Sequence, residues 1–578
     1  MPPPATPHQG TRPVPGSRSA AAPAGTRDKL TSRRLSLGRR LAQVAVALVP
    51  LLALAAGTGP TAQAATWRPA APLVVRTDDG AVRGMASGGA MEFLGIPYAA
   101  PPVGRLRWRP PQPAAHWQGI RDATRVGSQC AQPGGAILSD PTAGSSENCL
   151  YLNVYTPATA GTGRLPVMVW IHGGGFTGGA GSLYDGAVLA AREHVIVVTI
   201  NYRLGIFGFL ALSSLDKEGG PDSSGDYGLM DQQAALRWVR RNAAAFGGNF
   251  RDVTIFGQSA GGLSVCDNMA SPTAVGLFAR AIAESGCLTP VPSRQATEQR
   301  DEALAANLGC TDMATAAGCL RAKPTTELVA AEGTSPVPAT GWGPVPGNAV
   351  LPTAPAPAFA TGRYTHVPLL QGTNADEGRF LVGLEFDAMG KRLTAAQYPS
   401  AVQALFGASL TPRILARYPL SGYPSPDLAL AAAETDGGFS CPALQADDLL
   451  SASKVYGYEF ADPDPPDPFG VTFSFPLGSA HSTEIEYVFQ TMPDIGVTPR
   501  PDNITPPFTP AQFVLSDQIM GYWARFATTG DPNGNGVPPW PAFTPARHQI
   551  QELTPAGTAP QAGFAVEHQC TFWDSAGL

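Results

Sequence analysis

The sequence predicts an α/β fold in which helices cover both faces of a mostly parallel sheet. Three observations lead to this prediction. From residue 165 onward, short apolar runs alternate with longer runs whose apolar residues recur at helical spacing. The short runs are almost continuously hydrophobic, which is typical of strands buried on both faces. Several of them end in turns rich in glycine or polar residues, and in open α/β sheets ligands bind beyond such strand ends.

The predicted elements follow one another in a regular order. The helix after the second strand contains DYGLMDQQAALRWVRRNAAAF and stops at Gly247 and Gly248, because glycine commonly ends helices. The last predicted helix follows its strand after a single tight turn. The predicted strands cover residues 165–171, 195–202, 253–256, 367–374 and 455–461, and the predicted helices cover 226–246 and 260–270.

The first 64 residues predict a secretory leader. They hold eight basic residues against the single acid Asp28, followed by the apolar run LAQVAVALVPLLALAAG and the cleavage pattern Ala62-Gln63-Ala64. A membrane anchor is the alternative, but the run is short, contains Pro50 and is followed by a cleavage site rather than by positive charge. Arg33-Arg34 leaves the twin-arginine and the ordinary export route both open.

Removal of this leader would leave one domain, predicted over residues 65–578. It takes away eight basic residues and one acidic residue, and it leaves 31 basic and 44 acidic residues. An acidic domain has no electrostatic reason to bind nucleic acid or an anionic membrane surface. We therefore expect a secreted, extracellular protein without stable membrane insertion, whose oligomeric state stays open.

Eight cysteines in an exported chain predict disulfide bonds. Two pairs each close a short loop of mostly small residues, a third could tie the C-terminal segment to the body, and the last two cysteines are a fourth pair or buried thiols. No cysteine or histidine cluster has the spacing of a zinc site, so no metal is expected. In that order, the pairs are Cys130 with Cys149, Cys310 with Cys319, Cys441 with Cys570, and Cys266 with Cys287.

The segment VTIFGQSAGG (253–262) identifies Ser259 as a candidate nucleophile. The pattern G-x-S-x-G arises easily by chance in a chain with 65 glycines, but here it lies where a strand turns sharply into a helix. The segment HGGGF (172–176) also follows a strand, and the N–H groups of Gly174, Gly175 and Ala260 could bind a developing oxyanion. A merely flexible glycine loop would not explain that position.

A serine nucleophile needs a base, and the base needs an acid that orients it. With the chain order Ser, acid, His, the acid is Asp376 or Glu377 in QGTNADEGRF, directly after a predicted strand. The predicted base is His481, in a loop of glycine and serine that follows the next strand. The other histidines after the nucleophile are His366, which precedes the acid, and His548 and His568, which are predicted to be exposed.

Several motifs together resemble the type-B carboxylesterases, which include cholinesterases, fungal lipases and bacterial p-nitrobenzyl esterases. They extend from about residue 70 to the end of the chain: FLGIPYAAPPVGRLRWRPP, SENCLYLNVYTP, HGGGF, NYRLGIFGFL, GLMDQQAALRWVRRN, FGQSAGG, GTNADEGRF and WARFATTGDPN. The resemblance implies an α/β-hydrolase fold and cleavage of carboxylic esters through an acyl-enzyme, without a cofactor.

The resemblance also assigns roles to individual residues. It matches the nucleophile to Ser259, the base to His481 and the acid to Glu377 rather than Asp376. The oxyanion donors match Gly174, Gly175 and Ala260. The disulfides that the resemblance implies match Cys130 with Cys149, Cys310 with Cys319, and Cys441 with Cys570.

The chain departs from its relatives at two places. Most relatives have an acidic residue before the nucleophile, where this chain has Gln258, and we predict that Gln258 hydrogen-bonds to Glu484 and Tyr184 in a buried polar network. The loop between Cys130 and Cys149 lacks the aromatic residue with which cholinesterases bind a quaternary ammonium, so a preference for choline esters is not expected.

Two alternatives to a carboxylesterase remain. A lipase would use the same residues on longer acyl chains, although the 130–149 loop is short and mostly small or polar, unlike an apolar lid. A binding protein on the same fold would not need the catalytic residues, whereas every catalytic position is filled in this chain. GWGPVPG around Trp342 is predicted to form part of the acyl pocket.

Overall fold

A computed structural model describes residues 73–134, 143–159, 164–220, 222–332, 341–388, 390–491 and 506–577. The chain divides into two compact units, residues 1–66 and 67–578. The predicted leader, residues 1–64, lies outside the described residues, and everything below concerns the second unit. None of the helices in the described ranges has the length and apolar character needed to span a bilayer.

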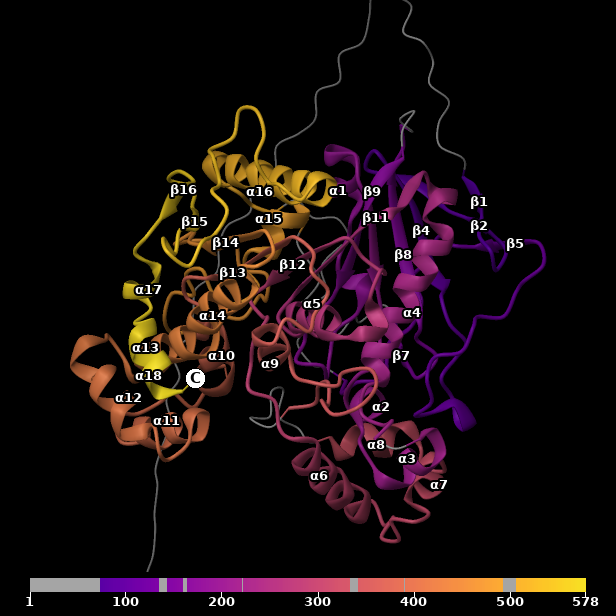
Figure 1. Cartoon of the computed structure of the whole chain (residues 1–578), viewed down its shortest axis with the longest axis horizontal. Helices are drawn as coiled ribbons and strands as arrows, with labels where there is room; N and C mark the ends of the chain where they lie inside the picture. The colour runs from indigo at the N-terminus through magenta and orange to yellow at the C-terminus, as the bar shows by residue number, and fades with distance from the viewer. Residues whose placement is uncertain are drawn as a thin grey trace, which may run out of the picture. The chain divides into compact units, whose positions relative to one another are not determined.

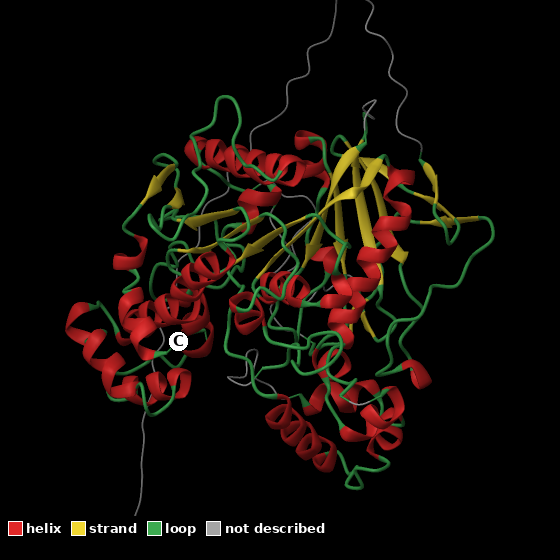
Figure 2. Cartoon of the chain, in the orientation of Figure 1, coloured by secondary structure: helices red, strands yellow, loops and turns green. Residues whose placement is uncertain are grey.

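The centre of this unit is an 11-stranded sheet, drawn as the yellow arrows in Figure 2. Seven neighbouring strands, β10-β9-β11-β12-β13-β14-β15, run parallel, and the strands at both ends of the sheet pair antiparallel. In sheet order the strands are β16 (Ala559–Gln561), β15 (Ile550–Leu553), β14 (Val455–Phe460), β13 (Leu369–Asn374), β12 (Arg280–Glu284), β11 (Gly248–Gln258), β9 (Leu165–Ile171), β10 (Ile196–Ile200), β8 (Tyr151–Pro157), β4 (Ala90–Pro97) and β3 (Met85–Ser87).

Five short strands form two further sheets. The three-stranded sheet contains β1 (Val74–Arg76), β2 (Ala81–Arg83) and β5 (Ile120–Asp122), and the two-stranded sheet contains β6 (Gln129–Cys130) and β7 (Ser145–Ser146). The second of these pairs the two sides of the loop that Cys130 and Cys149 close.

Helices lie on both faces of the large sheet (Figure 1). Below the sheet in that view, α11, α12, α13 and α18 form one group, and α3, α6, α7 and α8 form another. The described α-helices are α1 (Ala187–Glu193), α2 (Gly205–Phe209), α3 (Ser213–Gly219), α4 (Tyr227–Asn242), α5 (Ala260–Ala270), α6 (Arg294–Asn307), α7 (Ala316–Arg321), α8 (Thr325–Ala331), α9 (Pro355–Ala360), α10 (Gly378–Val382), α11 (Tyr398–Phe406), α12 (Thr411–Arg417), α13 (Pro426–Glu434), α14 (Cys441–Leu450), α15 (Ile485–Phe489), α16 (Pro510–Thr529), α17 (Phe564–Glu567) and α18 (Cys570–Ala576).

The alternation of side chains along β9 shows why the strands are apolar throughout. Val167, Val169 and Ile171 belong to the core cluster that contains residues of α4 and α5, whereas Met168 and Trp170 belong to the cluster that contains residues of α16. Both faces of the strand are therefore excluded from water, and no position can be polar without a buried partner.

The fold class and the main elements confirm the sequence prediction. The strand predicted over 165–171 and the helix predicted over 260–270 have those bounds, and most other predicted elements differ by one to four residues at an end. The largest difference is β11, which begins at Gly248 rather than at residue 253. Its pairing with β9 is irregular between Gly248 and Val253, so the first half lacks the continuous apolar pattern that predicts a strand.

All eight cysteines are paired in the structure, and the pair that the sequence left open is also bonded. Cys266 of α5 joins Cys287, just beyond β12. The three pairs that the resemblance implied, Cys130 with Cys149, Cys310 with Cys319, and Cys441 with Cys570, are bonded as well.

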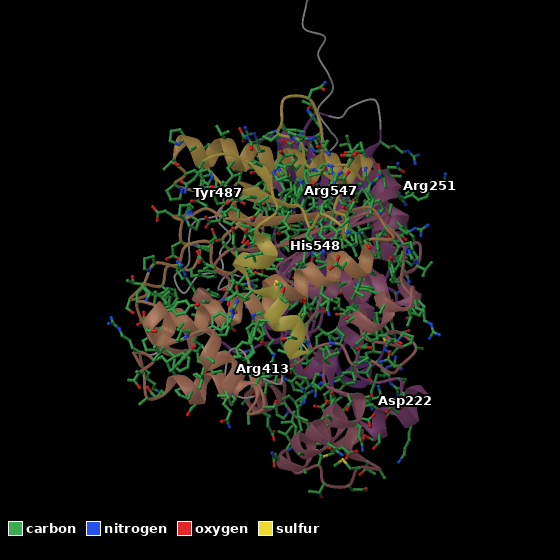
Figure 3. All side chains as sticks on the ribbon, turned by 60° about the vertical axis from the view of Figure 1, so that its left-hand side comes forward. Asp222, Arg251, Arg413, Tyr487, Arg547 and His548 are labelled. Carbon is green, nitrogen blue, oxygen red and sulfur yellow. A yellow bond between two sulfur atoms is a disulfide. The ribbon has the colours of Figure 1, made fainter. Side chains whose placement is uncertain are left out.

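His568 is buried, which corrects the expectation that it is exposed and solvated. Its Nδ1 lies 2.7 Å from Asp436 Oδ1, and its Nε2 lies 2.7 Å from Glu459 Oε1. Burial alone would lower the pKa of His568, but hydrogen bonds and charge from both carboxylates raise it to about 10. The buried imidazolium therefore connects the segment before α18 to β14 and to the turn that precedes α14. His548, labelled in Figure 3, is half-exposed and lies 3.2 Å from Asp448 Oδ1.

We expect the contribution of His568 to stability to depend on pH. Because the pKa rises from 6.5 to about 10 on folding, the contribution is complete below about pH 6.5 and is lost as the pH rises toward 10. His568→Gln should lower the Tm strongly near pH 6, by roughly 4 °C or more, and much less near pH 10. The measurement is the Tm difference from the wild type at both pH values. His548→Gln is the control, and equal Tm differences for His568→Gln at both pH values would contradict the charged pairing.

Candidate active site

Ser259 occupies the single-residue turn between β11 and α5. Its backbone has φ 58° and ψ −125°, a conformation that L-residues rarely adopt, and its N–H donates to the carbonyl of Glu284 at 2.9 Å. The turn places the half-buried Ser259 in the wall of a cavity at the carboxyl end of the sheet. This strand-to-helix geometry is the one expected from the G-x-S-x-G context.

The glycines around Ser259 are required by close backbone packing. A Cβ on Gly261 would lie 1.9 Å from the carbonyl oxygen of Ile171, and one on Gly257 would lie 2.5 Å from the same oxygen. Real Cβ atoms do not approach an oxygen this closely, so the carboxyl end of β9 can pass the nucleophile turn only if both positions lack a side chain. The pattern therefore reflects the contact between two neighbouring strands.

The HGGGF segment forms a tight turn opposite Ser259. Gly174 and Gly175 have φ of 106° and 60°, which favours glycine, and the Gly174 carbonyl accepts from the N–H groups of Thr177 and Gly178. The N–H groups of Gly174, Gly175 and Ala260 donate no hydrogen bond within the described part of the chain, and all three residues line the cavity with Ser259. Free N–H groups in this position can bind an anionic oxygen.

His172, which begins this segment, has a structural role. Its Nδ1 lies 2.8 Å from the Gly173 carbonyl, and its ring stacks on Tyr202 with centroids 4.4 Å apart. Burial lowers the pKa of His172 to about 4, so the ring is neutral at ordinary pH. A ring that resists protonation so strongly is a weak base, so His172 is not a candidate for the general base.

Glu377 and His481 form a buried pair beside Ser259. Glu377 lies in the turn after β13, where its Oε1 accepts from the N–H of Asn374 at 2.8 Å and its Oε2 lies 2.6 Å from His481 Nδ1. Asp376 points elsewhere, since it pairs with Arg379 and accepts from the N–H of Ser479. Of the two acids in the D-E-G segment, Glu377 is therefore the one that orients the imidazole.

The charge on Glu377 determines the electrostatics of His481. Burial alone would lower the pKa of His481, but the adjacent Glu377 carboxylate and its hydrogen bond raise it, and Glu484 adds to this effect. The pair thus stabilises an imidazolium on a side chain that is itself buried. Phe439 covers the ring, with centroids 5.1 Å apart.

Gln258 contacts the base, which differs from the predicted polar network. Its Nε2 lies 3.3 Å from His481 Nε2, and the structure places it on neither Glu484 nor Tyr184. Glu484 instead accepts from Asn374 and from Ser285, and the ring of Tyr184 packs against Trp170. The difference arises because the side chain before Ser259 faces the imidazole, while Glu484 is held by Asn374 at the end of β13.

Three buried residues near the site, Glu284, Asn374 and Trp523, were not predicted from the sequence. Glu284 is fully buried and accepts from Trp523 Nε1 at 2.8 Å. Burial, followed by the charge of Glu484, raises the pKa of Glu284 well above its usual range, and burial and the charge of Glu377 raise that of Glu484 to about 7. Asn374, at the end of GTN, was the one with a sequence signal, because a polar residue ends a buried strand next to the acid.

A large cavity lies beside Ser259 and His481. It has a volume of about 1840 Å³, and its wall includes Ser259, His481, Trp342 and Phe439. Trp342 therefore lies where the GWGPVPG segment was expected to form part of the pocket. The loop expected to exclude choline esters is described only in part, since residues 135–142 lie outside the described residues.

Within the described ranges, one cluster of acidic side chains has its carboxylate oxygens close enough together to hold a metal ion. The cluster consists of Asp216, Asp222 and Glu298. Arg294 forms ion pairs with all three side chains, and Asp222 is exposed at the edge of the molecule in Figure 3. Each of these carboxylates already has Arg294 as a cationic partner, so the cluster gives no reason to assign a cofactor.

The sheet order and the strand-turn-helix around Ser259 define an α/β hydrolase fold. The model of the "Carboxylesterase family" matches residues 71–573. The human cocaine esterase is 35% identical over 520 residues, covering 85% of this chain and 88% of its own length. The para-nitrobenzyl esterase of Bacillus subtilis is 36% identical over 481 residues, covering 81% and 92%.

A solved structure of a thermophilic PNB esterase is also similar. It has a TM-score of 0.73 and 33% identity, and the match covers 86% of this chain and 99% of that one. The chain belongs to the carboxylesterase family, and by this membership it is a carboxylic ester hydrolase.

Proposed function

We propose that the protein cleaves carboxylic esters through an acyl-enzyme formed on Ser259. The observation that carries the proposal is the buried Glu377–His481 pair, 2.6 Å apart, whose imidazole lies in the same cavity wall as the strained Ser259 turn. His481 accepts the proton of the Ser259 hydroxyl as the oxygen attacks the ester carbonyl, and Glu377 stabilises the imidazolium. His481 then gives the proton to the leaving alcohol.

The carbonyl oxygen becomes negative in the tetrahedral intermediate. The N–H groups of Gly174, Gly175 and Ala260 are the donors that would bind it, and no regrouping of hydrogen bonds is needed to free them. A water molecule, activated in turn by His481, completes the cycle by releasing the acid from Ser259.

In the structure described, His481 Nε2 contacts Gln258 rather than Ser259. Catalytic hydrogen bonds are often long in unliganded sites and tighten when substrate binds. We propose that Ser259 replaces Gln258 as the partner of His481 Nε2 in the substrate complex.

Gln258→Glu should move the acid limb of the pH profile to higher pH. A carboxylate beside His481 favours the imidazolium, and the base works only when it is neutral, so kcat/KM should fall at low pH and the limb should shift by about one pH unit. The measurement is kcat/KM against pH. Gln258→Met, which adds no charge, should keep the wild-type limb. A Gln258→Glu profile that coincides with the wild type would exclude an electrostatic role for this position.

Acyl-chain preference tests the choice between carboxylesterase and lipase. The purified protein should hydrolyse p-nitrophenyl esters from acetate to palmitate, with a maximum at short or medium chains. A maximum at palmitate would favour a lipase, for which the large cavity has room. No hydrolysis at any length by folded protein would contradict the proposed function.

We also propose that the chain is exported and cleaved after Ala64. The four disulfides support this, because such bonds form and persist in oxidising compartments. Sequencing the N-terminus of the protein from the culture medium should give Ala65 as the first residue. Retention of the whole chain in the cytoplasm with reduced cysteines would contradict export.

A further inference from the structure

Asp267 is a buried acid in the wall of the active-site cavity without a partner of its own. Asp267 is 5% exposed, and its side chain makes no hydrogen bond or ion pair within the described ranges of the chain. A buried polar group without a partner is unusual and costs free energy, so it calls for an explanation. The carboxyl group lies in the cavity wall, where a bound molecule could reach it.

The position of Asp267 on α5 fixes its relation to the nucleophile. Leu263 and Asp267 follow Ser259 at intervals of four residues, and all three line the cavity, so they share one face of the helix. Eight residues of α-helix correspond to about 12 Å along the axis. A substrate with its ester carbonyl at Ser259 and a chain along α5 would bring a group about 12 Å away to Asp267.

The surroundings of Asp267 favour a cation. Asp226, a second buried acid, acts on Asp267 electrostatically, and it is already held by the N–H of Val345 and the side chain of Asn348. Burial first, and then Asp226, raise the pKa of Asp267 well above its usual range, so these surroundings disfavour its charged form. A positive charge placed beside it would reverse this effect.

The nearby arginines do not supply that charge. Arg300, which also lines the cavity, stacks on Trp342 at 4.5 Å and pairs with Asp301. Arg294 pairs with Asp216 and its acidic neighbours. Both cations are thus engaged with other acids, which leaves Asp267 as an acceptor for a ligand.

We propose that Asp267 selects esters that carry a protonated amine about 12 Å from the reacting carbonyl, on either the acyl or the alcohol side. The carboxylate would pair with the ammonium in a mostly apolar cavity, where little water competes with the contact. The inference rests on the proposed function, because the amine is placed relative to Ser259.

The test compares matched pairs of esters. One series consists of p-nitrophenyl esters with acyl chains of increasing length that end in a protonated dimethylamino group, each paired with a neutral ester ending in an isopropyl group. A second series carries the same groups on the alcohol side of acetate esters. In at least one series, the ratio of kcat/KM for the charged to the neutral ester should peak where the chain spans about 12 Å.

Asp267→Asn should lower that peak ratio about tenfold, while p-nitrophenyl acetate should be cleaved within twofold of the wild-type rate, which also shows that the variant folds. Asp574→Asn, which removes an exposed acid elsewhere, is the control for net charge and should leave the ratio unchanged. A ratio that Asp267→Asn does not alter in either series would overturn the proposal and leave Asp267 as a protonated, water-bound side chain. Failure of the wild type on p-nitrophenyl acetate itself would instead count against the proposed function.

Discussion

Ser259→Ala should lower kcat for p-nitrophenyl acetate about a millionfold, because no other group can form the acyl-enzyme. The fold should persist, since alanine at φ 58° is no more strained than serine there. Any residual rate should come from the N–H groups of Gly174, Gly175 and Ala260 and from substrate binding. The measurement is the steady-state rate with freshly purified variant.

Ser482→Ala is the matched control for this prediction. Ser482 also lines the cavity and also has a positive φ, 75°, but it does not follow a strand and lies beside the base rather than in the nucleophile turn. Its substitution should cost less than about tenfold in kcat, as expected for a residue outside the triad. A Ser259→Ala variant that keeps more than a hundredth of the wild-type kcat would show that the nucleophile is another group.

Glu377→Gln should lower kcat about ten-thousandfold. The substitution keeps the size of the side chain, but the amide cannot stabilise the imidazolium and can hold His481 in the wrong tautomer. The variant should also lose the raised pKa of His481, because the Glu377 carboxylate is what outweighs burial there. The measurement is kcat together with the pH dependence of kcat/KM.

Asp376→Asn tests the choice between the two neighbouring acids. Asp376 pairs with Arg379 at the protein surface, 2.7 Å away, and does not contact His481. Its substitution should therefore change kcat only a few fold. If Asp376→Asn cost more than Glu377→Gln, the acid would have been assigned to the wrong residue.

The sequence predicted the parts of the fold that depend on local pattern. Strands such as β9 and β10 are buried on both faces, so their apolar runs are continuous, and α5 begins directly after Ser259. The glycines of GQSAG can also be recognised in the sequence, because the close approach of Ile171 excludes any side chain at Gly257 and Gly261. Each of these patterns can be recognised in a short stretch of sequence, even where its physical cause, as at Gly257 and Gly261, is a contact with a distant residue.

Features that depend on contacts between distant segments were harder to predict. Asp376 and Glu377 are adjacent, and the residues alone did not decide which would face His481. His568 lies near the end of the chain in a segment with no strong pattern, yet Asp436 and Glu459 enclose it. Asp436 and Glu459 lie 132 and 109 residues away from His568 in the sequence.

The same limit applies to the cavity. Gln258 was expected beside Glu484, but the turn at Ser259 directs it to His481. Asp267, in the middle of a helix, would ordinarily be taken for a solvent-facing residue, and only the packing of α5 against the cavity shows that it is buried.

The most direct test of the account is to trap the acyl-enzyme. The protein is mixed with p-nitrophenyl acetate, quenched with acid within milliseconds, digested and analysed by mass spectrometry. If Ser259 is the nucleophile, we expect a burst of p-nitrophenol close to one per protein molecule and an acetyl group on the peptide that contains Ser259, with neither in Ser259→Ala. Full turnover with no burst and no adduct, or with the acetyl group on another residue, would contradict it.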